Sequence, residues 1–318
     1  MTTKIPRTRQ FAQVDVFTDT PYYGNALAVV LDGTGLSDAE MQRFAAWTNL
    51  AETTFLLPPT PEGAAAGADY RVRIFTTAYE MPFAGHPTLG SCHAWLQAGG
   101  APKNNDTIVQ ECQVGLVRIR RSGQQLAFAA PALQRSAPSA EVVARLASAL
   151  GIAVEQVLAA QALNNGPRHF GLLLDDPDTV LAITPDLAAL RAWCQDTGNS
   201  GVGFAARYAT DSGSALIKRS NREARAFGAA HAPDTDAIDL EVRFFANDVQ
   251  VSEDPITGSF NASLAQWLIA DGHMPARYTA AQGRCIGREG RVAIERDAQG
   301  QVWGGGNTVN CISGIVSL

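Results

Sequence analysis

Two stretches of this chain resemble each other, and this repeat constrains the fold more than any other feature of the sequence. Residues 86–96 read HPTLGSCHAWL and residues 254–264 read DPITGSFNASL, so five of eleven positions are identical. Two unrelated windows of ordinary composition would share roughly one position. A strand pattern also precedes each copy, VRIF at 72–75 and VRFF at 242–245. We therefore predict a duplicated half-fold, with a cleft between the halves as the candidate active site.

The two copies differ most in chemistry at their first position, which is His86 in one copy and Asp254 in the other. Histidine is a poor helix cap, so His86 has no evident structural duty and is a candidate functional group. Asp254-Pro255 is also the pattern of a helix start, in which Asp caps the helix and Pro occupies its first turn. The sequence leaves both interpretations of Asp254 open.

Glycines lie close to both candidate groups, at Gly85, Gly90 and Gly258. Inside a helix each would cost up to about 1 kcal/mol, so we expect them at helix starts, where a ligand approaches the backbone. The free N–H groups of two facing helix starts would form a cradle for a carboxylate. Ser259 would add a hydroxyl group to this cradle, or would simply belong to the helix start.

Glu52 lies where a predicted helix gives way to an apolar strand, in the segment NLAETTF. It is either a surface residue or a carboxylate that faces the cleft, where burial would raise its pKa toward neutrality, as a general acid/base needs. Glu52, His86 and Asp254 are also residue types that bind metals, but their spacing matches no compact metal motif. Neither Ser91 nor Ser259 lies in a G-x-S-x-G nucleophile elbow. Proton transfer is the chemistry that these side chains serve best.

Composition narrows the domain organisation, the functional class and the compartment. With 318 residues, of which 46% are apolar, the chain is long enough for two domains, and Pro131 and Pro138 mark a boundary between halves of 1–130 and 131–302. The net charge of -6 argues against a nucleic-acid partner and favours a small molecule. Five scattered cysteines, the absence of a signal peptide and the absence of an apolar run of about 20 residues predict a cytoplasmic protein with reduced thiols and no membrane segment.

Hydrophobic periodicity predicts alternating strands and helices in both halves. A capping box formed by Ser37 and Glu40 predicts a helix over 38–48. Its apolar residues are available for the buried side: Met41, Phe44, Ala45 and Trp47. The segment after His86 is apolar over most of its surface, which predicts a helix buried within a sheet. Residues 58–69 are rich in Pro, Gly and Ala and predict a loop. Further strands are predicted at 10–18, 27–31, 107–120, 125–130, 170–174 and 202–207, and further helices at 140–150 and 186–194.

Residues 213–240 interrupt this alternation. A basic run between Lys218 and Arg225 is followed by Gly, Ala, Pro and Asp. In an acidic protein we interpret this stretch as a solvated insertion rather than as a site for a polyanion. The three glycines at 304–306 indicate a tight turn or a bulge before the final strand, because a lone triple glycine is weak evidence for phosphate binding.

Taken together, these motifs resemble the PhzF-like phenazine-biosynthesis isomerase family of the diaminopimelate-epimerase-like superfamily. The resemblance covers nearly the whole chain and rests on the order and spacing of short motifs. They are DVF at 15–17 with Gly24-Asn25, NLAETTF at 49–55, FAGHPTLG at 83–90, EDPITGS at 253–259 and the glycine-rich C-terminal strand. The resemblance implies an α+β fold of two pseudo-symmetric domains, each a curved mixed sheet around a central helix, with residues 303–318 returning to the first domain and the active site in the cleft.

The resemblance also implies a cofactor-independent isomerase that moves a proton on a small cyclic or unsaturated carboxylic acid, as in the isomerisation of dihydro-3-hydroxyanthranilate. Glu52 would be the acid/base that transfers the proton. His86, Asp254 and Ser259 would orient the substrate, and the backbone N–H groups of Gly258 and Ser259 would hold its carboxylate. The resemblance also implies a homodimer, because members of the family form homodimers.

Three other functions remain open at this point. A non-catalytic binding protein with a vestigial site would keep its ligand without the Glu52 carboxylate, and a metal-dependent hydrolase or lyase would lose activity to a chelator. An epimerase or racemase of the superfamily uses two thiols, whereas the equivalent loops here, 84–86 and 255–257, contain no cysteine. Departures from the family pattern at Ala26 and Asn247 bear on the choice of substrate rather than on the fold.

Overall fold

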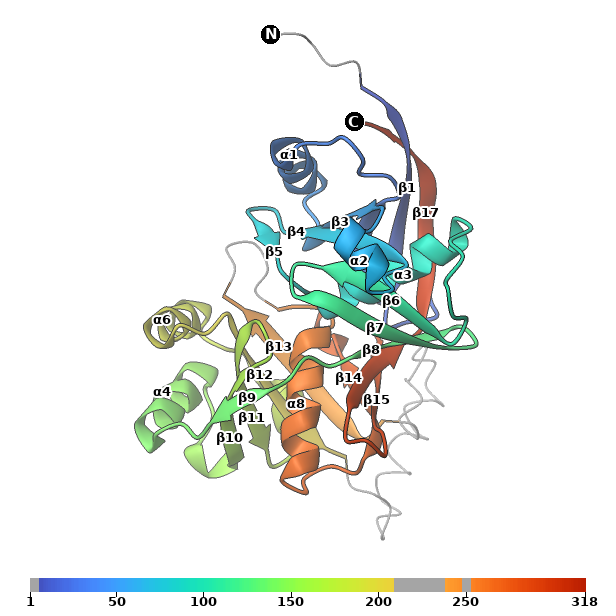
Figure 1. Ribbon diagram of the computed structural model, residues 1–318. Coiled ribbons are helices and arrows are strands. Elements are labelled where there is room, and N and C mark those ends of the chain that lie inside the picture. Colours follow the sequence, from blue (N-terminus) through green and yellow to red (C-terminus); the bar gives the residue numbers. More distant parts are fainter. Residues whose placement is uncertain (1–5, 209–237, 248–252) are drawn as a thin grey trace, which may run out of the picture.

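The computed structural model describes residues 6–208, 238–247 and 253–318. Two halves lie one above the other in Figure 1, and each is a strongly curved mixed sheet around one central helix, α3 in the first half and α8 in the second. The predicted insertion at 213–240 falls almost entirely outside the described residues.

The strands and the central helix follow a similar order in both halves, and the other helices differ. The first half contains β1 (Thr8–Val16), β2 (Asn25–Val30), α1 (Asp38–Thr48), β3 (Glu52–Leu57), α2 (Pro61–Ala65), β4 (Tyr70–Phe75), β5 (Glu80–Met81), α3 (Gly85–Gln97), β6 (Thr107–Cys112), β7 (Gly115–Ser122) and β8 (Gln125–Ala129). The second half contains β9 (Gln134–Ser136), α4 (Ala140–Leu150), η1 (Val154–Gln156), β10 (Val157–Asn164), β11 (Arg168–Leu174), α5 (Pro177–Ala182), α6 (Leu187–Thr197), β12 (Gly201–Arg207), β13 (Leu240–Ala246), α8 (Gly258–Ala270), β14 (Arg277–Gln282), η3 (Arg284–Ile286), β15 (Gly290–Arg296) and β16 (Val302–Gly306). The last strand, β17 (Thr308–Ser317), pairs antiparallel with β1.

The strands of the described residues form one continuous sheet whose two halves repeat each other. Neighbouring strands follow the order β17-β1-β2-β3-β4-β6-β7-β8-β16-β15-β14-β13-β12-β11-β10-β9, with the short β5 beside β4. Parallel pairs occur at equivalent places, β2–β3 and β4–β6 in the first half and β11–β12 and β13–β14 in the second. Each parallel pair needs a crossover connection, which a helix supplies. This pseudo-twofold arrangement about β8 and β16 confirms the predicted α+β fold of two pseudo-symmetric domains.

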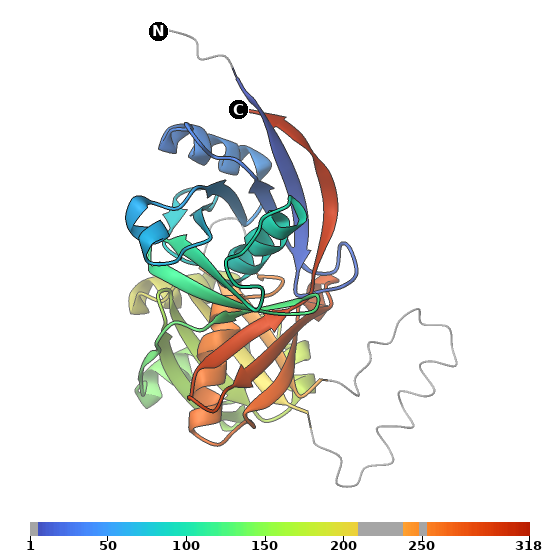
Figure 2. The same cartoon turned by 45° about the vertical axis from the view of Figure 1, so that its right-hand side comes forward.

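The end of the chain lies against its beginning. Paired residues run from Thr8 and Ser317 at one end of the β1–β17 ladder to Val16 and Thr308 at the other. Figure 2 shows the two strands as a long curved ribbon on the outside of the first half. The C-terminal segment therefore returns to the first half after the chain has completed the second.

The two central helices are buried because each is enclosed by its own sheet. Nine of the thirteen residues of α3 and eleven of the thirteen residues of α8 are buried, which confirms the helix predicted after His86. The prediction that Gly90 lies at a helix start is wrong, because Gly90 lies within α3. A Cβ atom at Gly90 would lie 2.6 Å from Leu27 Cδ2, so the glycine allows α3 to approach β2 closely.

Several local predictions are confirmed and others are corrected. Helix α1 begins and ends where the capping box predicted, but Trp47 is 80% exposed and stacks on Phe44 instead of entering the core. The predicted loop at 58–69 contains the short helix α2, which Thr60 caps. The single strand predicted over 107–120 is two strands, β6 and β7, that pair with each other. Strands β10, β14 and β15 and helix α5 were not predicted, although α5 begins with Asp176-Pro177, the same helix-start pattern as Asp254-Pro255.

The structure also corrects the alignment of the two copies. Helices α3 and α8 have equal length and begin at Gly85 and Gly258, so these two glycines are equivalent. In this alignment His86 corresponds to Ser259, not to Asp254, and the match of the two sequence windows is out of register by five residues. Of the two interpretations left open for Asp254, the structure excludes the helix cap, because the N-cap of α8 is Thr257.

Candidate active site

The N-termini of the two central helices meet at the boundary between the halves. A Cβ atom on Gly85 would lie 3.0 Å from the Cα of Gly258, and a Cβ atom on Gly258 would lie 3.1 Å from the Cα of Gly85. Only glycine allows this approach. Neither N-cap residue, Ala84 or Thr257, caps its helix through its side chain. The first N–H groups of both helices therefore lack a side-chain cap, and both helix dipoles present positive ends, which favours an anion between them.

Glu52 is the first residue of β3 and lies next to this junction. The parallel pairing of β2 with β3 places it opposite Leu27. Its side chain is 15% exposed, and its Oε2 lies 3.3 Å from Nε2 of His86. Glu52 is therefore not an ordinary surface residue, because its carboxylate lies inside the protein and faces an imidazole.

His86 is the second residue of α3, and its ring is enclosed between the halves. Burial lowers the pKa of His86 to about 3, an effect that the carbonyl of Ala26 offsets in part. The ring is therefore neutral at physiological pH. Its Nδ1 lies 3.2 Å from Nδ2 of Asn25. The 3.3 Å contact with Glu52 is not an aligned hydrogen bond, so Nε2 keeps hydrogen-bonding capacity within the described residues.

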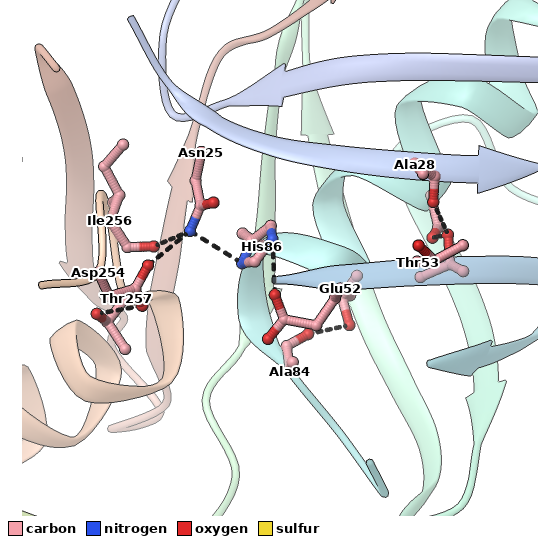
Figure 3. A network of polar contacts seen from close by, with 12 residues as sticks. Asn25, Ala28, Glu52, Thr53, Ala84, His86, Asp254, Ile256 and Thr257 are labelled. Atoms are coloured by element: carbon pink, nitrogen blue, oxygen red, sulfur yellow. Dashed lines mark hydrogen bonds and ion pairs between the residues drawn. The ribbon is translucent and has the colours of Figure 1, made fainter. Parts of the chain in front are cut away.

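Asp254 comes from the second half and faces the same place. Its Oδ2 accepts a hydrogen bond of 2.6 Å from the Thr257 hydroxyl, and its Oδ1 accepts one of 3.0 Å from Nδ2 of Asn25. Burial raises the pKa of Asp254, and these two hydrogen bonds oppose the rise. Figure 3 shows Asn25 between Asp254 and Thr257 on one side and His86 with Glu52 on the other.

A buried ion pair holds the segment that carries Asp254. Both oxygens of Glu253 accept hydrogen bonds from Arg243, at 3.0 Å from Nε and 2.9 Å from Nη2. Nη1 of Arg243 donates to the carbonyls of Val180 and Ile183, so the buried guanidinium is well satisfied. Asp254 follows directly and donates its backbone N–H to the Phe244 carbonyl on β13 at 2.9 Å. Asp254 is thus anchored to the sheet on both sides of its Cα.

Two residues that the sequence did not predict as site residues complete the network. Asn25 was noticed only as part of a short motif, and Gln282 not at all. Gln282 donates to the Asp254 carbonyl and to Thr257 Oγ1, and its Oε1 accepts from the backbone N–H of Thr257 and from Asn261. No signal in the sequence marks Gln282, because its partners lie more than twenty residues away along the chain.

Ser259 occupies in the second half the place of His86 in the first. It is buried, and its carbonyl accepts a hydrogen bond of 3.0 Å from Asn165. Gly85, His86, Gly258 and Ser259 are therefore brought together at the two helix starts. Glu52 contacts the ring of His86. Asp254 accepts a hydrogen bond from Asn25, whose side-chain nitrogen also lies next to His86.

A separate hollow lies away from the two helix starts. A hollow of about 480 Å³ runs between β7, β8 and β14 to β16, and its lining includes Arg120, Arg277 and Trp303 but none of the predicted site residues. The predicted site itself is closed in this structure, because Gly85 and Gly258 are in contact there. The buried groups with shifted pKa values that were predicted as site residues, His86 and Asp254, lie at the two helix starts and not in this hollow.

Metal-binding groups, apolar helices and thiols bear on the other functions that the sequence left open. Within the described ranges, no group of three or more His, Cys, Asp and Glu side chains is placed to hold a metal ion. None of the helices described is long and apolar enough to cross a membrane. All five cysteines are free thiols, and Cys92 is buried within α3, where burial raises the pKa of its thiol to about 12. A thiol of this kind is a poor acid/base, which disfavours a two-thiol racemase.

Comparison with known proteins identifies the family of the chain. The family model of phenazine biosynthesis-like proteins, PhzC-PhzF, matches residues 14–314. The chain belongs to this family. It is 31% identical to "Antisense-enhancing sequence 1" of Schizosaccharomyces pombe over 318 residues, which cover 96% of this chain and 97% of that protein. It is 36% identical to the trans-2,3-dihydro-3-hydroxyanthranilate isomerase of Pseudomonas fluorescens over 180 residues, which cover 56% of this chain and 61% of that enzyme.

A solved structure shows the same fold over the whole length. The PhzF-family protein of Bacillus anthracis superposes with a TM-score of 0.76 at 22% sequence identity, covering 98% of this chain and all of that one. Curated relatives of this PhzF-like chain are named as isomerases, and the chain is an enzyme of the isomerase class.

Proposed function

We propose that this PhzF-like protein is a cofactor-independent isomerase that moves a proton on a small cyclic or unsaturated carboxylic acid by general acid/base catalysis. The proposed reaction is similar to that of trans-2,3-dihydro-3-hydroxyanthranilate isomerase, the activity named for a relative from Pseudomonas fluorescens. The observation that carries the proposal is the 3.3 Å contact between Glu52 and His86 beside two facing helix N-termini.

The helix starts supply the binding energy for the acid. A substrate carboxylate between α3 and α8 would accept hydrogen bonds from the backbone N–H groups at Gly85, Gly258 and Ser259, which no side chain caps. The dipoles of both helices favour the negative charge. Because the two glycines are in contact in the closed arrangement, we propose that the halves separate to admit the substrate.

Glu52 carries the proton. Its ionised carboxylate removes a proton from one carbon of the substrate, and the resulting carboxylic acid returns a proton to another carbon, so that no group is consumed. Electrons that the first step releases would be delocalised toward the bound carboxyl group, where the helix N-termini stabilise the developing charge. His86 and Asp254 would orient the polar groups of the substrate, because both carry hydrogen-bonding atoms at the same junction.

We also propose that the protein acts in the cytoplasm and as a homodimer. Support for the compartment comes from the five free cysteines, since an oxidising compartment favours paired cysteines. The homodimer rests on the family alone.

The test is turnover of dihydro-3-hydroxyanthranilate in heavy water, followed by absorbance and by mass spectrometry. We expect the wild-type protein to convert the compound with uptake of solvent deuterium. Glu52→Gln should lower the turnover number at least about 100-fold, because an amide cannot act as the acid/base. Exposed Glu155 in η1 provides the matched control, and Glu155→Gln should leave turnover unchanged.

Each other outcome removes a definite part of the proposal. Equal turnover by wild type and Glu52→Gln would remove Glu52 from the mechanism. Binding of the compound without conversion by either protein would favour a non-catalytic binding protein. Absence of both binding and conversion would exclude this substrate.

A further inference from the structure

Asn25, at the start of β2, is a buried amide that contacts both halves of the molecule. Its side chain is enclosed, with 2% of the residue exposed. Its Nδ2 lies 2.9 Å from the carbonyl oxygen of Ile256, 3.0 Å from Oδ1 of Asp254 and 3.2 Å from Nδ1 of His86. One nitrogen atom therefore faces three different groups.

The chemistry of these neighbours fixes the orientation of the amide. The backbone carbonyl of Ile256 has no proton to give, so the atom that faces it must be the NH2 group of Asn25 and not its oxygen. Asp254 Oδ1 is a second acceptor at hydrogen-bond distance. The two hydrogens of the NH2 group serve these two oxygens and Nδ1 of His86, so one hydrogen is shared between two acceptors, and the amide has no freedom to flip.

This orientation constrains the imidazole of His86. If Nδ1 carried a hydrogen, an N–H group would face the NH2 group of Asn25 at 3.2 Å, with no acceptor between two donors. An unprotonated Nδ1 instead places its lone pair against that NH2 group. A neutral imidazole then carries its one hydrogen on Nε2, the nitrogen that lies 3.3 Å from Oε2 of Glu52.

We infer that Asn25 is a positioning residue that fixes His86 in its Nε2–H tautomer, so that an N–H group and not a lone pair lies 3.3 Å from the Glu52 carboxylate. The opposite tautomer would place the lone pair of Nε2 against that carboxylate, an arrangement of two acceptors. Because the same amide also binds Asp254 and Ile256, closure of the two halves and selection of the tautomer are linked. The consequence for turnover rests on the proposed function, whereas the tautomer itself does not.

The tautomer is measured directly by nuclear magnetic resonance. In protein labelled with ¹⁵N in histidine, protonated and unprotonated ring nitrogens have well-separated chemical shifts, and two-bond ¹H–¹⁵N correlations distinguish Nδ1 from Nε2. The His86 signals are assigned by their loss in His86→Gln. At neutral pH we expect an unprotonated Nδ1 and a protonated Nε2 in the wild type, and a mixture of both tautomers in Asn25→Ala.

Two controls and a kinetic measurement separate positioning from loss of structure. Exposed Asn104 provides the matched substitution, and Asn104→Ala should leave the His86 signals unchanged. A thermal melt of Asn25→Ala shows that the variant is folded. Where the wild type turns over dihydro-3-hydroxyanthranilate, Asn25→Ala should lower kcat on the order of 10- to 100-fold with little change in KM.

The outcomes for the inference and for the proposed function are distinct. A wild-type spectrum with a protonated Nδ1 would overturn the inference whatever the protein catalyses. An Nε2–H tautomer that persists unchanged in folded Asn25→Ala would remove Asn25 as its cause. Lack of turnover by the wild type would count against the proposed substrate alone and leave the spectroscopic result standing.

Discussion

The two halves of the molecule share their supports but not their reactive groups. In each half an arginine of the strand before the central helix binds a glutamate through Nε and Nη2 together, Arg73 with Glu80 in the first and Arg243 with Glu253 in the second. Each glutamate lies five residues before the glycine that begins the helix. The ion pairs are thus equivalent by position and by geometry.

A second support is also repeated inside each half. Thr88 of α3 bonds to the Ala84 carbonyl one turn earlier and accepts from Gln110, while Asn261 of α8 bonds to the Thr257 carbonyl and to Gln282. The glutamines lie on equivalent strands, β6 and β14. A buried polar pair of this kind fixes the position of each helix start relative to its sheet.

The residues at the tips of this repeated frame differ. The first half contributes His86 and Glu52, and the second contributes Ser259 and Asp254 with its Thr257 partner. A symmetric frame therefore holds an asymmetric set of groups around the two helix starts. The repeated ion pairs and glutamine contacts thus fix the positions of the two helix starts, and differences at a few positions there determine which reactive groups lie between the halves.

The largest expected difference between the halves concerns the two ion pairs. The side chains of Arg243 and Glu253 are 6% and 8% exposed, whereas those of Arg73 and Glu80 are 16% and 19% exposed and Arg73 also contacts exposed Asp38. Glu253→Gln leaves a more deeply buried guanidinium without its counter-charge and should lower the free energy of unfolding by about 3–5 kcal/mol. Glu80→Gln should cost about 1 kcal/mol. Urea unfolding measures both values, and equal losses would show that burial does not distinguish the two pairs.

A smaller effect should appear in the dependence of stability on pH. Burial lowers the pKa of His86 in the first half, and of His169 in the second, to about 3. Because both values lie below that of an unfolded histidine, about 6.5, the unfolded chain binds more protons between these limits. The contribution of the two neutral rings to the free energy of unfolding should therefore be complete above about pH 6.5, and the free energy of unfolding should fall as the pH decreases toward 3.

Single substitutions assign this loss to each half. His86→Gln and His169→Gln should each make the free energy of unfolding less sensitive to acid between pH 6.5 and 4. The difference in unfolding free energy between each variant and the wild type at pH 8, where both rings are neutral, is the reference for this comparison. A slope that neither substitution changes would mean that other groups account for the acid sensitivity. A change from His86→Gln alone would show that the two buried rings are not comparable.

The comparison of the halves also shows what the sequence could and could not predict. The repeat, the two buried helices and the capped helix α1 follow from local patterns, because residue spacing and caps act over a few positions. The register of the repeat did not follow, because the matching Pro, Gly and Ser residues all lie within α3 in the first copy, whereas in the second the Pro precedes α8 and the Gly and Ser begin it. The equivalent glutamates of the two ion pairs, Glu80 and Glu253, lie five residues before Gly85 and Gly258, so an alignment that pairs His86 with Asp254 does not bring them together.

The contacts of Asn25 lay beyond the reach of sequence patterns for another reason. Asn25 meets Asp254 and Ile256 across 229 and 231 residues of chain, so no local spacing encodes these contacts. Glu52, by contrast, could be named from the sequence, because it lies in the motif NLAETTF that resembles the family, although its position alone was equally that of a surface residue. Its distance to His86 depends on the parallel pairing of β2 with β3, which the sequence did not specify.

The smallest predicted effects concern the starts of the helices. Ser37 caps α1, with its Oγ accepting from the Glu40 N–H at 3.3 Å and the Glu40 carboxylate accepting from the Ser37 N–H at 2.7 Å. Helices α3 and α8 have no such cap, which is what an anion cradle requires. Ser37→Ala should lower the free energy of unfolding by about 1 kcal/mol and leave KM unchanged.

The opposite substitution adds a cap where the structure has none. Ala84→Ser places a hydroxyl at the N-cap of α3, where it would bond to N–H groups that the substrate carboxylate is proposed to use. It should maintain or slightly raise the free energy of unfolding while raising KM, because the hydroxyl competes with the substrate for the same donors. Chemical unfolding and steady-state kinetics on both variants provide the test. If KM is unchanged in Ala84→Ser although the cap forms, the carboxylate is not held by the N-terminus of α3.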